Sequence, residues 1–372
     1  MFPTINRESS MLGFGCMRFP TTPDDKIDES EAIRMIRHAI DNGVRYIDTA
    51  YPYHGGESEI VIGKALKDGY REKVILTTKL PVWLVKTHED MMKFLDEQLK
   101  KLDTPYVDFY ILHAMNNERM DAMQKLDYKR FYAEAIAQGK VRYPGFSFHD
   151  DAKAFLRILH DWDQWGMCQV QMNILDDENQ ATLEGIREAG RRGVGVVVME
   201  PLRGGLLANP PVDVKAVYDA YAVRRSPVEW GFRYLYAMPE VITILSGMST
   251  WAQVTDNLRI FDMAKRPTLT DEELALYQKV KATYLARTKT RCTGCKYCQP
   301  CPMGVQIPRI FQGYDAAMLR ADSSFKAGYA QIQADHADAS QCIHCRKCEH
   351  VCPQHLPITR FLEEIHAASA AE

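Results

Sequence analysis

The stretch Val194–Met199 reads VGVVVM, an apolar run that lacks the alternation of polar and apolar residues seen in half-exposed strands. A continuous apolar run of this kind is typical of a parallel sheet that helices cover on both faces. Comparable runs recur through the first two thirds of the chain, at Tyr46–Ala50, Val74–Leu80, Val107–His113, Val141–His149, Cys168–Asn173 and Val241–Gly247. We therefore expect an α/β fold.

Amphipathic segments separate these runs and predict helices at Ser30–Asn42, Glu57–Lys67, Glu89–Leu102, Tyr128–Gln138, Asp151–His160, Asn179–Arg191, Pro227–Ala237 and Trp251–Met263. Ser30 is the expected N-cap of the first. Seven or eight strand–helix units over about 250 residues predict a (β/α)8 TIM barrel, with a Rossmann-like open sheet as the alternative. The barrel is favoured because no G-x-G-x-x-G motif follows an early strand.

Eight of the ten cysteines lie in two runs near the C-terminus. The first run contains Cys292, Cys295, Cys298 and Cys301, and the second contains Cys342, Cys345, Cys348 and Cys352. The second run has the spacing C-x2-C-x2-C-x3-C-P of bacterial two-cluster ferredoxins, in which the fourth cysteine binds the other cluster. In the first run only two residues precede Cys301, so this cysteine departs from the pattern, although Pro302 follows it.

Two [4Fe–4S] clusters explain these runs better than the alternatives do. Structural zinc uses two cysteine pairs for each ion and leaves the repeated Cys-Pro ending unexplained. A disulfide framework belongs to secreted proteins, and the start MFPTINRESS lacks the apolar core of a secretory signal. The two remaining cysteines, Cys16 and Cys168, are expected to be buried core thiols.

The length of 372 residues predicts more than one domain. We expect a barrel over residues 1–265, a linker helix over 266–288, and a small, mainly helical ferredoxin-like domain over 289–372. The linker helix is expected to begin near Thr270 and to end near Ala286, and the two cysteine runs to be joined by a helical segment over Ile310–Gln333.

The composition argues against several classes of partner. The formal net charge is −3 without a basic stripe, which disfavours nucleic acid and anionic membrane surfaces. No apolar run approaches the roughly 18 residues that a membrane-spanning helix needs. Together with the reduced thiols, this predicts a cytoplasmic protein.

Polar side chains end three successive predicted strands: Asp48 in YIDTA, Lys79 in VILTTKL and His113 in VDFYILH, with Tyr53 in the loop after the first. Taken singly, each has a structural explanation, but TIM barrels carry their chemistry at this end of the strands. A tyrosine with a pKa of about 10 is a poor acid at neutral pH, and a neighbouring lysine lowers that pKa. Asp48 would balance the lysine, and His113 would orient a substrate oxygen.

The chain resembles the aldo-keto reductases, specifically the bacterial branch with a ferredoxin-like C-terminal domain. The resemblance is carried by LGFGCMRFP, GVRYIDTAYPYHGGESEIVIGKAL, TTKL, YILH, GFSFH, VQMN, VVVMEPLRGG and LSGMSTWAQVTDNL. It implies that Asp48, Tyr53, Lys79 and His113 form the catalytic tetrad. A hydride would then pass between a nicotinamide and a carbonyl carbon while Tyr53 protonates the carbonyl oxygen.

The same resemblance implies a nicotinamide site. Its members would be Ser147 and Gln171 at the carboxamide, Glu200, Pro201, Leu202 and Gly204 along the pyrophosphate, and Gly247, Met248, Ser249, Gln253 and Asn257 at the adenosine. NADP(H) is the family default. However, the last loop has only Arg259 nearby to hold a 2′-phosphate, so NAD(H) stays an alternative.

Several functions fit these features. The chain could be a carbonyl reductase or alcohol dehydrogenase for a small molecule, with Trp83 walling the pocket and the clusters either relaying electrons to a partner protein or holding the tail. It could instead be a redox-neutral epimerase or eliminating enzyme with tightly bound nicotinamide, or a nicotinamide-sensing subunit.

Overall fold

The computed structural model describes residues 8–262, 266–292, 294, 296–352 and 354–370. The chain divides into two compact units. Met1–Gly204 with Val228–Leu269 forms the first, and Gly205–Pro227 with Thr270–Glu372 forms the second. The predicted domain boundaries at 265 and 288 stay predictions.

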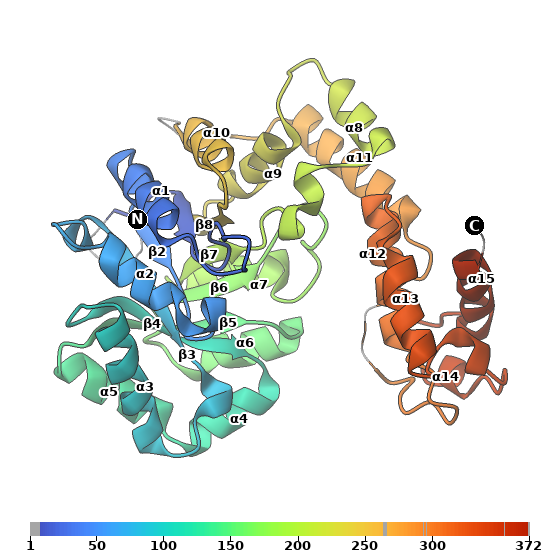
Figure 1. Cartoon of the computed structure of the whole chain (residues 1–372), viewed down its shortest axis with the longest axis horizontal. Helices are drawn as coiled ribbons and strands as arrows, with labels where there is room; N and C mark the ends of the chain where they lie inside the picture. The colour runs from blue at the N-terminus through green and yellow to red at the C-terminus, as the bar shows by residue number, and fades with distance from the viewer. Residues whose placement is uncertain (1–7, 263–265, 293, 295, 353, 371–372) are drawn as a thin grey trace. The chain divides into compact units, whose positions relative to one another are not determined.

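Eight parallel strands close into a barrel in chain order in the first unit (Figure 1). They are β1 (Leu12–Gly15), β2 (Tyr46–Asp48), β3 (Ile75–Leu80), β4 (Val107–Met115), β5 (Val141–Phe148), β6 (Met167–Gln171), β7 (Gly195–Met199) and β8 (Val241–Gly247). The closed barrel confirms the predicted fold and rules out the open sheet. β1 was not among the predicted strands because its sequence LGFG is short and half glycine, yet it closes the barrel between β2 and β8.

Helices alternate with these strands. In the first unit they are α1 (Glu29–Asp41), α2 (Ser58–Ala65), α3 (His88–Lys101), α4 (Asn117–Lys125), α5 (Tyr128–Ala137), α6 (Ala152–Asp161), α7 (Thr182–Arg191), α9 (Pro227–Tyr236, from the last residue of the other unit) and α10 (Trp251–Phe261). Ser30 is not the N-cap of α1: Asp28 accepts the Glu31 amide, and the Ser30 hydroxyl donates to Asp28 instead. α4 escaped prediction because only Met120 and Met123 of its residues are buried.

Large side chains fill the middle of the barrel, so it is a packed core and not a pore. Tyr46, Ile75, Phe109, Ile111, Met167, Val197 and Leu245 form one buried cluster there. The functional side chains are therefore confined to the rim.

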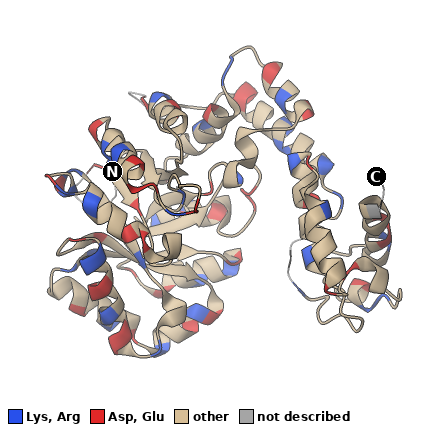
Figure 2. Cartoon of the chain, viewed as in Figure 1, with Lys and Arg blue, Asp and Glu red and all other residues tan. Residues whose placement is uncertain are grey.

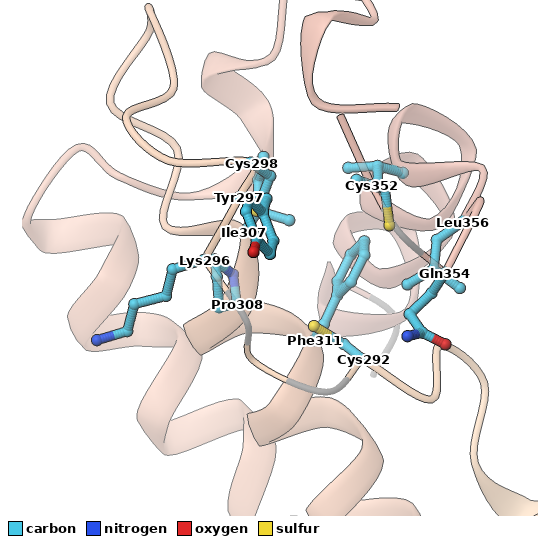
Figure 3. Close-up of a pocket in the computed structure, with 11 residues that line it drawn as sticks. Cys292, Lys296, Tyr297, Cys298, Ile307, Pro308, Phe311, Cys352, Gln354 and Leu356 are labelled. Carbon is cyan, nitrogen blue, oxygen red and sulfur yellow. The ribbon is translucent and has the colours of Figure 1, made fainter. Parts of the chain in front are cut away.

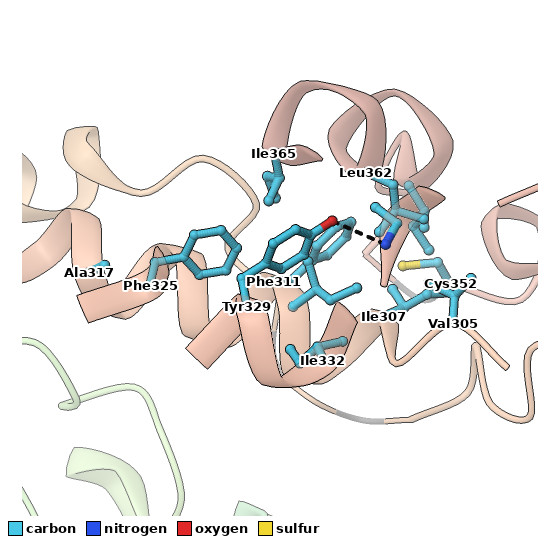
Figure 4. Close-up of a cluster of buried hydrophobic side chains, with 13 residues drawn as sticks. Val305, Ile307, Phe311, Ala317, Phe325, Tyr329, Ile332, Cys352, Leu362 and Ile365 are labelled. Carbon is cyan, nitrogen blue, oxygen red and sulfur yellow. Dashed lines mark hydrogen bonds between the residues drawn. The ribbon is translucent and has the colours of Figure 1, made fainter. Parts of the chain in front are cut away.

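The second unit is mainly helical, with α8 (Val212–Asp219), α11 (Asp271–Arg287), α12 (Ile307–Arg320), α13 (Ser324–Ala334), α14 (Lys347–His350) and α15 (Ile358–Ala370). Thr270 caps α11 through a capping box with Glu273, as the sequence predicts. The helical segment predicted over Ile310–Gln333 consists of two helices, because α12 ends at Arg320 and its C-cap Ala321 has a left-handed φ of 55°. Phe311, Tyr329, Leu362 and neighbouring apolar residues form the core of this unit (Figure 4).

Acidic and basic residues are interspersed along the helices (Figure 2). No helix in the described part of the chain has the length and apolar character needed to cross a membrane.

A buried ion-pair network at the start of β4 yields a stability prediction. Asp108 is buried and accepts from Arg71, from Arg142 and from the Leu76 amide. Asp108→Ala should lower the free energy of unfolding by about 3–5 kcal/mol, because it leaves the Arg71 charge buried without its partner. Urea denaturation followed by circular dichroism measures this change. Lys26→Ala, which breaks an exposed pair with Asp24, is the control; equal effects of the two substitutions would refute the assignment.

Candidate catalytic site and cysteine clusters

Three of the four predicted catalytic residues are in direct contact at the C-terminal rim of the barrel. The Lys79 Nζ lies 2.6 Å from Asp48 Oδ1, 2.7 Å from the Thr49 carbonyl oxygen and 3.2 Å from Tyr53 Oη. Asp48 ends β2, Lys79 is near the end of β3, and Tyr53 begins the short helix Tyr53–Gly56. Asp48 Oδ2 accepts from Gln169 Nε2 at 3.0 Å, so both of its oxygens are hydrogen-bonded.

Burial sets the protonation of this group. Burial alone would lower the pKa of Lys79, but Asp48 and Tyr53 together raise it above its ordinary value, so the ammonium is kept. Burial raises the pKa of Tyr53, and Lys79 opposes this without overcoming it. The expectation that Lys79 would bring the Tyr53 pKa below its ordinary value is therefore wrong for the resting protein. Tyr53 therefore holds its proton at neutral pH.

His113 lies beside Tyr53, with 6.1 Å between the ring centroids and the planes nearly perpendicular. Its Nδ1 is buried and has no hydrogen-bond partner among the described residues. Burial, aided by the nearby charges of Lys79, His149 and Arg119, lowers the pKa of His113 to about 2. The imidazole is therefore neutral and has hydrogen-bonding capacity left for a ligand.

A β-bulge aims His113. The register between β4 and β5 shifts between Leu112 and Met115, and Ala114 has a left-handed φ of 54°. The Ala114 amide donates to Ser147 Oγ at 2.7 Å. Ser147, predicted as a cofactor residue, thus also holds the bulge in this structure.

Gln171 ends β6 and is already engaged by protein groups. It donates to Asp176 Oδ2 at 2.8 Å and accepts from Gln180 Nε2 at 3.1 Å. These two partners could not be predicted from the sequence, since both lie in an irregular loop. A nicotinamide carboxamide at Gln171 would have to replace one of these hydrogen bonds.

The loop after β7 repeatedly adopts left-handed backbone. Glu200, Arg203 and Gly204 have φ values of 54°, 48° and 64°. Leu202, after Pro201, turns its side chain toward Gly231 of α9. The backbone of this loop is therefore irregular at the place where the pyrophosphate is predicted to lie.

The loop between β8 and α10 is held by its own side chains. Gln253 Oε1 accepts the amides of Ser249 and Thr250 within a capping box, and Asn257 donates to Ser246 Oγ at 2.9 Å. Gly247 and the buried Met248 lead into this loop. Gln253 and Asn257 thus shape the loop in this structure, whether or not they also meet adenosine.

Arg18 is a candidate binding residue that the sequence prediction missed. Its side chain lies against Gly247, with Cδ 3.2 Å from where a Cβ would be, and its guanidinium is 3.9 Å from a Glu200 oxygen. The Arg18 carbonyl accepts from Ser249 Oγ. Arg18 therefore connects the two loops predicted to hold the cofactor. By contrast, Arg259 is paired with Asp256 and Glu229.

Three described cysteines from both runs line one partly open pocket (Figure 3). They are Cys292 and Cys298 of the first run and Cys352 of the second, with Phe311 and Leu356 among their apolar neighbours. Thiolates are the ligands of iron–sulfur clusters, and Cys352 lies where the two-cluster spacing puts the fourth ligand of the first cluster. The pocket thus fits a cluster by its donor set.

The other predicted ligands are less closely gathered. Cys301, Cys342 and Cys348 pack against the same apolar core, Cys345 is exposed, and Cys295 lies outside the described residues. Within the described ranges, no three Cys, His, Asp or Glu side chains converge on a single metal-ion position.

Comparison with known proteins matches two segments of the chain to families. Residues 11–282 match the Aldo/keto reductase family, and residues 291–356 match a 4Fe-4S dicluster domain. The Glycine max protein "Probable aldo-keto reductase 1" is 27% identical to this chain over 219 residues. The match covers 55% of this chain and 59% of that protein. The chain thus covers less than two thirds of this relative.

Solved structures agree on the fold. The aldo-keto reductase AKR11C1 from Bacillus halodurans, in its holo form, is 28% identical with a TM-score of 0.63, over 75% of this chain and 95% of that one. An aldo-keto reductase from Klebsiella pneumoniae, solved in complex with NADPH, is 23% identical with a TM-score of 0.57, over 73% and 91%.

The neutrality of His113 can be measured. Because its folded-state pKa of about 2 lies below the ordinary 6.5, only the unfolded chain binds this proton as the pH falls, so His113 costs stability below about pH 6.5 and nothing above it. Imidazole ¹⁵N NMR, with His113→Asn for assignment, should show a neutral ring from about pH 8 to about pH 5. A titration midpoint near pH 6.5 would contradict the described environment.

Proposed function

Because the chain belongs to the aldo/keto reductase family, we propose that it interconverts a small-molecule carbonyl and its alcohol with a nicotinamide cofactor. The observation that carries this proposal is the buried Lys79 ammonium, which contacts both Asp48 and Tyr53 Oη.

We propose that Tyr53 donates the proton to the substrate and that the residues around Tyr53 control this donation. Tyr53 Oη donates to the carbonyl oxygen, and the phenolate that results is stabilised by the adjacent Lys79 ammonium. Asp48 keeps that ammonium charged and in place. The neutral His113 donates its N–H to the same carbonyl oxygen and orients it. A bound nicotinamide would supply the hydride for the carbonyl carbon.

Ser147 and Gln171 would hold the nicotinamide carboxamide, and Arg18 supplies a cation between the loops that would flank the phosphates. Glu200, Pro201, Leu202 and Gly204 would follow the pyrophosphate, and the β8–α10 loop would meet the adenosine. NADP(H) is the first cofactor to test, since a Klebsiella pneumoniae protein of this fold binds NADPH. The pairing of Arg259 with two carboxylates keeps NAD(H) as the alternative.

The second unit would carry two [4Fe–4S] clusters. Cys292, Cys295, Cys298 and Cys352 would hold one, and Cys342, Cys345, Cys348 and Cys301 the other. Their proposed roles are electron relay to a partner protein or stabilisation of this unit. Clusters and reduced thiols keep the cytoplasm as the predicted compartment.

Tyr53→Phe tests the proton donor. Without the hydroxyl, kcat for carbonyl reduction should fall by at least about 100-fold, while affinities for NADPH and NADH, titrated by fluorescence, stay close to those of the wild type. Tyr51→Phe is the matched control, because the Tyr51 hydroxyl in the same loop contacts Glu97. Retained activity in Tyr53→Phe, or equal losses in both variants, would reject Tyr53 as the acid.

Iron analysis tests the clusters and their ligands. Anaerobically purified protein should contain about eight iron and about eight sulfide per chain, from two four-iron cubes. Cys352→Ser should reduce both to about four, because it removes a ligand of the first cluster, whereas Cys168→Ser in the barrel core should leave them unchanged. Iron content unaffected by Cys352→Ser would overturn the cross-run assignment.

A further inference from the structure

The ring of Trp83 lies between the side chains of His113 and Arg119 and contacts both. Trp83, in the short helix Val82–Leu84, is 43% exposed, and its ring centroid is 5.1 Å from that of His113. On the Trp83 ring lies the Arg119 guanidinium, with Cζ 5.4 Å from the centroid. Tyr53, His113, Trp83 and Arg119 therefore form a continuous row at the barrel rim.

Arg119 has no carboxylate partner in the described part of the chain. Within the ranges that the structure describes, no Asp or Glu lies at ion-pair distance from it, and its one side-chain hydrogen bond goes to the Ala114 carbonyl. An arginine carries five N–H donors. Nearby arginines differ: Arg130 pairs with Glu134, and Arg157 pairs with Asp121.

The other groups beside this row that could carry a positive charge are paired or neutral. Lys79 is bound to Asp48, and His113 is neutral. The guanidinium therefore places a positive charge beside the partly exposed Trp83 ring and the neutral His113. A planar fork of this kind binds carboxylates and phosphates through two parallel hydrogen bonds.

We propose that Arg119 binds an anionic group of the substrate, so that the enzyme acts on carbonyl compounds that carry a carboxylate or a phosphate. The inference rests on the proposed function, since the carbonyl is placed at Tyr53 and His113. Trp83 would form the flat apolar wall along which the substrate chain lies between its carbonyl and its anion. Arg119 is then a specificity-determining residue.

If Arg119 has only a structural role, its substitution is expected to have a different effect. Through the Ala114 carbonyl it also contacts the bulge that aims His113. If that were its whole purpose, substitution would impair charged and neutral substrates equally.

Matched substrates separate these roles. Straight-chain ω-oxo acids of about three to six carbons are compared with the uncharged aldehydes of equal length, and glyceraldehyde 3-phosphate with glyceraldehyde, to distinguish carboxylate from phosphate. The wild type should prefer one charged series, measured as the ratio of kcat/KM values. Arg119→Gln should reduce that ratio by about 10- to 100-fold, mainly through KM, and Arg119→Lys by less. Arg157→Gln, as control, should leave the ratio unchanged.

Other outcomes overturn the proposal. A wild-type ratio near one, or a ratio unchanged in Arg119→Gln while kcat falls for all substrates, would show that Arg119 only positions the bulge. Calorimetric titration of the same oxo acids onto wild type and Arg119→Gln gives their affinities without turnover. Tighter wild-type binding without any reduction would refute the reductase function alone, and equal binding would refute the role of Arg119.

Discussion

The ion pair between Asp48 and Lys79 is the interaction on which the rest of the site depends. Two buried charges are costly unless each is well paired and further hydrogen-bonded, and here Gln169, the Thr49 carbonyl and Tyr53 complete the arrangement. Strands β2 and β3 bring the pair together, and the closed barrel prevents it from separating. The Lys79 ammonium can therefore face Tyr53 while it stays paired with Asp48, as the proposed proton donation by Tyr53 requires.

The rim around this pair is built from irregular backbone. Ala114, Glu200 and Arg203 all have left-handed φ values although none is glycine, and each lies beside a residue proposed to bind substrate or cofactor. Ser147 connects two of these functions, because its hydroxyl accepts from the Ala114 amide and it is also the residue proposed to hold the nicotinamide carboxamide. A ligand that changes the Ser147 hydrogen bond would therefore also affect the orientation of His113. Regular strands supply rigidity, and the distortions at their ends supply the geometry of the site.

Much of this architecture could be predicted from the sequence, because continuous apolar runs such as VGVVVM indicate buried parallel strands regardless of tertiary detail. The tetrad positions followed from strand ends and from family motifs. What escaped prediction depends on contacts between distant segments. β1 is too short and too rich in glycine to be recognised from its own sequence. Arg18 and Arg119 are recognised as candidate binding residues only from their contacts with Gly247 and Trp83 in the folded chain. The pKa of Tyr53 was misjudged because burial, which opposes Lys79, is a property of the folded chain.

The most direct test of the central claim is single-turnover hydride transfer in the double variant Asp48→Asn/Lys79→Met. This change removes both charges together, so no ion is left unpaired in the barrel and the fold should persist. Stopped-flow absorbance of the reduced nicotinamide, with saturating carbonyl substrate, gives the rate. We predict a folded protein that binds the cofactor and transfers hydride at least about 100-fold more slowly than the wild type. A rate within about twofold of the wild type would contradict it, because Tyr53 would then donate its proton without the ion pair.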